Sequence, residues 1–329
     1  MKHKTIILMI TAAVLLAAAA LFNVCVGASD LDFTRLWNAL ISGPDQSAAG
    51  SILWYVRFPR TAACILAGAA LAVSGAVIQK VLANNLASPG IIGINAGAGL
   101  AVALCFAMGS ITPWSIAGAA FTGAVTATFL VVLTAQKAGA SRTTVVLGGV
   151  AVTACLSAVT EAVITLIPDA ALANADFRVG GFSAVHSARL LPAAILIPAG
   201  IVLIWSLSNE MDLLSLGDDT AHSLGMRVAW VRNILLILAA LLAGTAVSFA
   251  GVLSFVGLIV PHIAKRFIGT ESKALIPFCA FIGGAFVAFC DLAARMFFKP
   301  YELPAGIIMS AVGGPFFIVL LLKKKGKRT

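Results

Sequence analysis

The segment Ser208–Trp230, SNEMDLLSLGDDTAHSLGMRVAW, is the most polar internal stretch of a chain that is otherwise nearly all apolar. We call residues 208–230 the hub. Apolar runs flank it on both sides, and it holds acidic residues at positions 210, 212, 218 and 219. Its pattern predicts a short helix that Asp218 or Asp219 caps, that Ala221 and Leu224 make apolar on one side, and that Gly225 ends. Taken alone, the segment would also fit an ordinary solvated loop.

The composition around the hub predicts a membrane protein. The chain has 329 residues, of which 60% are hydrophobic and 11% are charged. A soluble domain is about 45–50% apolar and about 25% charged, so this chain has too few polar side chains for a water-facing surface. Long apolar runs in a bilayer satisfy their backbone hydrogen bonds as helices. We therefore expect an all-α polytopic membrane protein with a single transmembrane domain over residues 1–329.

The formal net charge of +9 does not indicate a nucleic-acid-binding protein. The basic residues stand at the ends of apolar runs and crowd the C-terminal tail, as expected of membrane anchors. The six cysteines lie singly inside apolar stretches without a Cys-x-x-Cys spacing. We interpret them as small buried hydrophobes, and we expect no disulfide framework, metal site or cofactor.

The predicted spans are read from the apolar runs. These are residues 6–26, 61–82, 91–109, 114–135, 143–167, 190–207, 231–266, 274–296 and 305–322. The run 231–266 is too long for one ordinary span and tight for two. Two crossings put both termini and most lysines and arginines on the cytoplasmic side, whereas one crossing puts the lysine-rich tail outside. The sequence thus predicts about ten spans, the eighth of them short.

The first apolar run also resembles a secretory signal, with a possible cleavage site at residues 26–28. A signal core spans about 7–15 apolar residues, and this run is longer and is followed by further spans. We expect it to be a retained first span, and cleavage stays open.

The chain repeats itself once. Residues 66–78, LAGAALAVSGAVI, resemble residues 242–254, LAGTAVSFAGVLS. The two segments belong to spans five crossings apart, so they run in opposite directions, as in the inverted repeats of transporters. Small residues also recur in any closely packed membrane helix. We expect helix packing or gating roles, with the prolines breaking helices, for six residues: Gly68, Gly75, Gly244, Gly251, Pro89 and Pro261.

No Gly-x-x-x-x-Gly-Lys-Ser/Thr motif is present, so the chain has no P-loop to bind ATP phosphates. Glu161 and Asp291 are the acids expected at membrane depth, where a charge is costly and often functional. An ion-coupled secondary transporter would need one of them as a proton relay or an ion ligand. Asp291, however, has Arg295 four residues further on, which is a natural helical partner.

Several motifs resemble those of one transporter family. They are RFPR (57–60), GAALAVSGAVIQ (68–79), NLASPGIIG (85–93), FVGLIVPHIAKR (255–266), DLAAR (291–295), ELPAGI (302–307) and GGPFF (313–317). Their order and spacing are similar to those of the FecCD-type permeases. Those proteins are the membrane subunits of binding-protein-dependent ABC importers for ferric siderophores, haem and cobalamin.

The resemblance implies roles for particular residues. Asp219 and Ala221, with Gly225 four residues later and Asp218 beside them, resemble the motif that couples such permeases to their ATPase. The Ile-x-Leu-Pro that follows in the fuller motif is absent here. The positions Arg57, Arg60 and Arg295 match arginines that pair with glutamates of the binding protein. Guanidinium groups suit bidentate carboxylate contacts, although anchoring at the membrane interface explains the same residues.

By resemblance, the chain is expected to be a permease subunit and not an enzyme. Its partners would be two cytoplasmic ATPase subunits, an extracytoplasmic binding protein, and a second copy of itself or a paralogous permease. The expected location is a bacterial or archaeal cytoplasmic membrane, with both termini inside. The implied cargo is a ferric siderophore, with haem or cobalamin as alternatives, and an ion-coupled secondary transporter is the alternative from another class.

Overall fold

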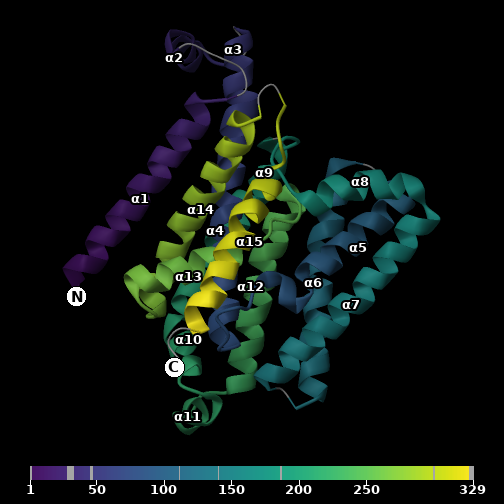
Figure 1. Cartoon of the computed structure of the whole chain (residues 1–329), viewed down its shortest axis with the longest axis vertical. Coiled ribbons are helices and arrows are strands. Elements are labelled where there is room, and N and C mark those ends of the chain that lie inside the picture. Colours follow the sequence, from purple (N-terminus) through teal and green to yellow (C-terminus); the bar gives the residue numbers. More distant parts are fainter. Residues whose placement is uncertain are drawn as a thin grey trace.

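The computed structural model describes residues 2–27, 33–44, 47–110, 112–139, 141–185, 187–298 and 301–325, which form helices and no strand (Figure 1). In chain order the elements are α1 (Lys2–Cys25), α2 (Phe33–Ser42), α3 (Ala48–Ser51), a π-helix η1 (Ile52–Arg57), α4 (Phe58–Val81), a 3₁₀-helix η2 (Pro89–Ile92), α5 (Ile94–Ala107), α6 (Pro113–Lys137), α7 (Arg142–Leu166), α8 (Pro168–Val179), α9 (Ser187–Ser206), α10 (Ser208–Ser215), α11 (Asp218–Ser223), α12 (Val228–Ala250), α13 (Val256–Ile268), α14 (Ser272–Met296) and α15 (Ala305–Lys325). The predicted all-α fold is confirmed.

The helix α4 lies at the centre of the bundle. Nearly all of its residues are buried, and it packs against α9, α12, α13 and α14. A helix that is apolar all round belongs in such a position. On one side of this core lie α5, α6, α7 and α8, which contact one another and reach it through the packing of α6 on α12 (Figure 1). The helix α1 lies on the other side, against α14.

The two halves of the predicted repeat run in opposite directions. The Ser74 hydroxyl of α4 donates to the Ala239 carbonyl oxygen of α12 at 2.7 Å. The C-terminal end of α4 lies beside α10, and the N-terminal end of α12 lies beside α10 and α11. We call this the hub end of the molecule, and the opposite end, with α2 and α3, the distal end (Figure 1). The first glycine of each repeat segment faces a neighbouring helix. Gly68 packs α4 on α14, and Gly244 packs α12 on α6.

Each predicted apolar run forms a helix, and the run 231–266 divides into α12 and α13. By length and composition, the described helices include six that could cross a membrane: His3–Cys25, Ala48–Val81, Pro113–Lys137, Arg142–Leu166, Val228–Ala250 and Ser272–Met296. The pair of α9 and α10 is bent by 55° and could form one more span. The helices α5, α13 and α15 are shorter. Ten crossings therefore stay a prediction.

The glycines serve two different purposes. A side chain at Gly68 would meet the Gly283 carbonyl oxygen, and one at Gly75 the Gly257 carbonyl oxygen, both closer than 3.0 Å. These two positions allow the close helix approach that the sequence predicts. Gly251 differs, because it ends α12 with φ +69 and turns the chain towards α13.

The two prolines also differ from each other. Pro89 begins the four-residue helix η2, which is the short element expected there. The predicted helix break at Pro261 is wrong, because this residue lies inside α13, which continues to Ile268. A proline has no N–H and leaves the carbonyl four residues earlier without its helical donor. That carbonyl, of Gly257, accepts a hydrogen bond from Gln79 Nε2 at 3.3 Å instead, which compensates for the missing bond.

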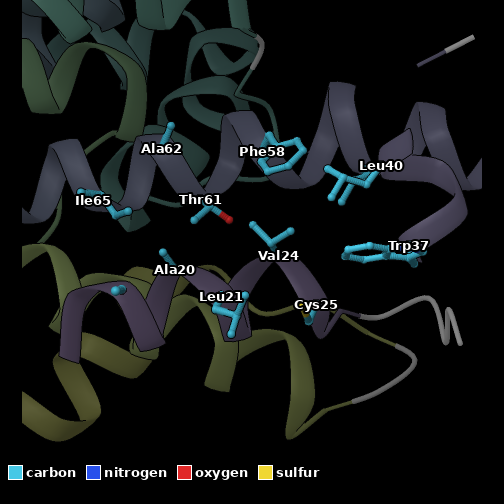
Figure 2. Close-up of a pocket in the computed structure, with 12 residues that line it drawn as sticks. Ala20, Leu21, Val24, Cys25, Trp37, Leu40, Phe58, Thr61, Ala62 and Ile65 are labelled. Carbon is cyan, nitrogen blue, oxygen red and sulfur yellow. The ribbon is translucent and has the colours of Figure 1, made fainter. Parts of the chain in front are cut away.

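The polar connection after the first span is largely helical. Its helix α2 lies over the distal ends of α1 and α4 and lines with them an open apolar pocket of about 770 Å³. Figure 2 shows Trp37 and Leu40 of α2 facing Val24 of α1 and Phe58 of α4 across this pocket. The connection thus forms a structured cover at the distal end, where the sequence indicated only a polar loop.

Candidate functional site

The hub forms two short helices, α10 and α11, joined through Gly217. The helix α11 ends as predicted at Gly225, whose φ is +84. The Gly225 N–H donates to the His222 carbonyl oxygen at 2.9 Å, and the Met226 N–H donates to the Ala221 carbonyl oxygen at 3.1 Å. This pair of bonds is the Schellman arrangement, which needs a residue with positive φ at its centre.

Two details of the predicted helix are wrong. Gly217, not an aspartate, occupies the N-cap position, and Asp218 and Asp219 are the first two helical residues. Their carboxylates still lie where the positive end of the helix dipole favours them. Only Ala221 is buried, whereas Leu224 is 61% exposed and does not pack into the protein.

Asp218 ties the hub to two long helices. Its Oδ1 accepts from Arg142 Nε of α7 at 3.1 Å, and its Oδ2 accepts from Arg232 Nη2 of α12 at 2.6 Å. Arg142 Nη2 also donates to the Leu214 carbonyl oxygen of α10 at 2.6 Å. Burial raises the pKa of Asp218, but the hydrogen bonds and charges of Arg232 and Arg142 outweigh this effect and hold the pKa below its ordinary value of 3.8.

The stabilisation from Asp218 is expected to depend on pH. A carboxyl group with a lowered folded-state pKa stabilises the protein fully above its unfolded pKa, near 3.8, and loses this contribution as pH falls through the folded value. Asp218→Asn should melt at a lower temperature than the unmodified protein. The difference between the two melting temperatures should be constant from pH 7 to pH 5 and should disappear as the pH falls below 3.8. A difference that persists into acid would show that charge is not its source.

A second carboxylate ties the hub to another pair of helices. Asp212 of α10 pairs with Lys80, and its Oδ1 accepts from the Ser272 N–H at 3.1 Å and from the Ser272 hydroxyl at 2.8 Å. Lys80 Nζ donates to Ser272 Oγ at 2.6 Å. We call Lys80, Asp212 and Ser272 the clamp. Sequence analysis missed it, because a lysine at the end of a span does not reveal a partner 132 residues away.

The outer surface of the hub combines polar and apolar side chains. Asp219, His222 and Gly225 are exposed on α11 and just beyond it. Large apolar side chains beside them are also exposed, namely Leu216, Leu224 and Trp230. Exposed apolar side chains gathered on a polar segment are typical of a surface that another protein or the membrane covers.

The three predicted docking arginines meet at the distal end and are at most 7% exposed. Arg60 Nη2 lies 2.9 Å from Asp291 Oδ1, and Arg60 Nη1 lies 2.7 Å from Glu302 Oε2. Arg295 Nε lies 3.1 Å from Asp291 Oδ2, as the spacing of these two residues predicts. The contact between Arg60 and Asp291 joins residues 231 apart and was not foreseen.

The other arginine contacts secure the C-terminal end of α1. Arg57 Nη1 donates to the carbonyl oxygens of Val24 at 2.9 Å and Cys25 at 2.8 Å. Arg295 Nη1 donates to the Val26 carbonyl oxygen at 3.1 Å. The last carbonyls of a helix lack intrahelical donors and carry partial negative charge, so cations stabilise them. We call Arg57, Arg60, Asp291, Arg295 and Glu302 the arginine network.

Both acids expected at membrane depth have arginine partners. Asp291 is fully buried between Arg60 and Arg295, and Glu161 Oε1 lies 3.0 Å from Arg178 Nη1 on the surface. Neither arrangement resembles an ion site. Within the described residues, no group of three or more His, Cys, Asp or Glu side chains could hold a metal ion.

Comparisons with known proteins agree with these features. The iron(3+)-hydroxamate import permease FhuB of Bacillus subtilis is 32% identical over 330 residues, covering 98% of this chain and 85% of FhuB. The vitamin B12 import permease BtuC of Escherichia coli is 34% identical over 316 residues, covering 94% and 93%. The solved structure of a metal-chelate type ABC transporter, inward-facing, superposes with a TM-score of 0.85 at 24% identity, covering 96% and 98%. The family model described as "FecCD transport family" matches residues 15–323, and the chain belongs to this family.

Proposed function

We propose that this chain is the permease subunit of an ABC importer that moves a ferric siderophore into the cytoplasm, driven by a separate ATPase subunit. Membership of the FecCD transport family supports a transport role for the chain rather than a catalytic one. The relatives carry different cargoes by name, iron-hydroxamate for FhuB and vitamin B12 for BtuC. Cobalamin and haem therefore stay the alternatives.

The observation that carries the proposal is the geometry of the hub. The helix α11 is held at its start by Asp218 and is ended by Gly225, and it exposes Asp219 and Leu224. A short helix fixed in this way can follow the movement of a partner without bending. An ATPase that binds the hub differently in its two nucleotide states would then shift the permease between conformations, whereas equal binding would shift nothing.

The proposed assembly places the hub end in the cytoplasm. Figure 1 shows both chain ends in the half of the molecule that holds the hub, which supports a shared side for the termini. Two ATPase subunits would bind there, with the binding protein at the distal end. A second copy, or a paralogous permease, would complete the membrane part.

Docking of the binding protein by Arg57, Arg60 and Arg295 also stays a proposal. The contacts of these arginines described above lie within the chain, so a partner's carboxylate would have to replace one of the present partners. Glu302 is the best placed for such an exchange, because its side chain is 34% exposed while Asp291 is fully buried.

The coupling role is tested by placing a charge on the hub surface. We expect Leu224→Arg to weaken ATPase binding at least tenfold, about 1.4 kcal/mol, because docking would bury an unpaired cation. The affinity is measured by titrating the permease in nanodiscs with its ATPase subunit. ATP-driven uptake of ferric siderophore, haem and cobalamin is measured separately, in proteoliposomes that also hold the binding protein.

The matched control is Ile41→Arg on α2, which changes a similarly exposed side chain at the distal end. It should leave ATPase binding unchanged. If Leu224→Arg binds the ATPase as tightly as the unmodified chain, the hub is not the docking site. Uptake of cobalamin or haem in place of the siderophore would correct the proposed cargo.

A further inference from the structure

The carboxylate of Asp212 lies between the opposite ends of two antiparallel helices. Lys80 is in the last turn of α4, and Ser272 is the first residue of α14. A cation near a helix C-terminus and an anion near a helix N-terminus both oppose the partial charges of the helix ends. Asp212 therefore stabilises both ends at once, by attracting Lys80 and by accepting the Ser272 N–H.

Two of the three clamp residues are buried, and the third, Asp212, has a side chain that is 36% exposed and contacts both of them. Lys80 is 7% exposed and Ser272 is fully buried. The neighbours of Asp212 in α10, Met211 and Leu214, are also fully buried, and α10 contacts both α4 and α14. A charged group with few routes to water depends on its partner, so Lys80 and Asp212 are expected to stay paired while the hub moves.

The two helices held by the clamp form one stiff unit. A side chain at Gly68 of α4 would collide with the Gly283 carbonyl oxygen of α14, and one at Gly283 would collide with the Gly68 carbonyl oxygen. With their backbones this close, neither helix can shift far without the other. Their distal ends are joined again, since Arg60 of α4 contacts Asp291 of α14 through two guanidinium nitrogens. A helix of 24 residues is about 36 Å long, so the unit connects the two ends of the molecule.

The hub thus has two separate attachments. Asp218 contacts α7 and α12, whereas Asp212 contacts α4 and α14. Only the second pair of helices carries Arg60, Asp291 and Arg295 of the arginine network. We propose that the clamp is a positioning site that transmits movement of the hub to the arginine network. Asp212 would thereby link ATP binding and hydrolysis at the hub end to the distal surface on which the binding protein docks. This inference rests on the proposed function.

The test separates transmission from docking. Asp212→Asn keeps an oxygen that can accept the Ser272 N–H but loses the attraction to Lys80. In proteoliposomes with ATPase and loaded binding protein, we expect the stimulation of ATP hydrolysis by the binding protein, and the cargo moved per ATP, to fall at least tenfold. The affinity for the ATPase subunit should stay within twofold, because the Asp212 carboxylate on α10 is engaged by Lys80 and Ser272, whereas the proposed docking surface is centred on α11. A residue that only stabilised the fold would not lower the stimulation and the cargo moved per ATP while leaving the affinity unchanged.

Glu271→Gln is the matched control. It removes the same charge one residue from Ser272, where the exposed Glu271 side chain makes no capping bond to α14. It should change none of the three quantities. If Asp212→Asn does not assemble, the double variant Lys80→Met, Asp212→Asn removes both charges and leaves no buried cation, and the same loss of stimulation is expected.

Two outcomes would contradict the proposed role of the clamp, and a third would contradict the proposed function. Normal stimulation in a folded Asp212→Asn chain overturns the role of the clamp. A parallel loss of ATPase binding also overturns it, because Asp212 would then belong to the docking surface. If the unmodified chain shows no ATP-driven uptake at all, the proposed function fails and the clamp variants are compared no further.

Discussion

Gly75→Ala is expected to destabilise the folded protein by about 3 kcal/mol or more, which is at the upper end of the cost of overpacking. The added methyl group would lie closer than 3.0 Å to the carbonyl oxygen, the carbonyl carbon and the Cα atom of Gly257. These are backbone atoms, so no side-chain rotation relieves the collision. The carbonyl also accepts a hydrogen bond from Gln79 Nε2, which a displacement of α13 would break.

Gly118→Ala in α6 is the matched control for this substitution. Apart from neighbouring residues of its own helix, nothing lies within 4 Å of the position that its methyl group would take, and alanine favours a helix more than glycine does. Unfolding of both variants in detergent should show a large loss for Gly75→Ala and no loss for Gly118→Ala. Equal stability of the two variants would show that α4 and α13 separate more easily than their packing indicates.

Asp291→Ala is expected to cost about 3–5 kcal/mol, because removal of one partner from a buried ion pair leaves uncompensated charge. Here two buried guanidinium groups, those of Arg60 and Arg295, would lose their shared anion. The yield of folded protein and its unfolding in detergent measure this effect. The double variant Arg60→Met, Asp291→Ala should recover part of the loss, since it removes one of the two stranded cations.

Glu161→Ala provides the comparison with an exposed pair. Glu161 and Arg178 are 61% and 58% exposed in the single chain, and ion pairs that face water contribute about 0–1 kcal/mol. This variant should unfold almost as the unmodified protein does. A cost as large as that of Asp291→Ala would mean that the surroundings of Glu161 are less polar than its exposure indicates.

Patterns local in the sequence predicted the fold. Apolar runs predicted the long helices, and the likeness of residues 66–78 to 242–254 predicted that α4 and α12 run in opposite directions. The break at Pro261 was wrong because a proline removes one hydrogen bond and the rest of α13 remains bonded. The helix α8 and the helices of the connection before α4 lie in stretches with weak or mixed patterns, where packing decides the structure.

The sequence predicted only those features of the candidate site that depend on residues close together in the chain. Gly225 ends α11 because the turn requires a positive φ, and Arg295 meets Asp291 because one helical turn separates them. Partners of Asp212, Asp218 and Arg60 lie far away in the chain, so no spacing rule could identify them. The docking roles of the hub and of the three arginines stay predictions.

The way in which the end of α1 is held has a consequence for biosynthesis. Its carbonyl at Val26 is bound by Arg295, a residue synthesised 269 positions later, and Asn23 Nδ2 donates to the Ala288 carbonyl oxygen in the same late helix. Arg57 can bind the Val24 and Cys25 carbonyls as soon as α4 follows, but the Val26 carbonyl and the Asn23 amide lack these partners until α14 has been inserted. Translation arrested before α14 should leave α1 unprotected from a protease that cuts at its distal end. Arrest after α14 should protect it.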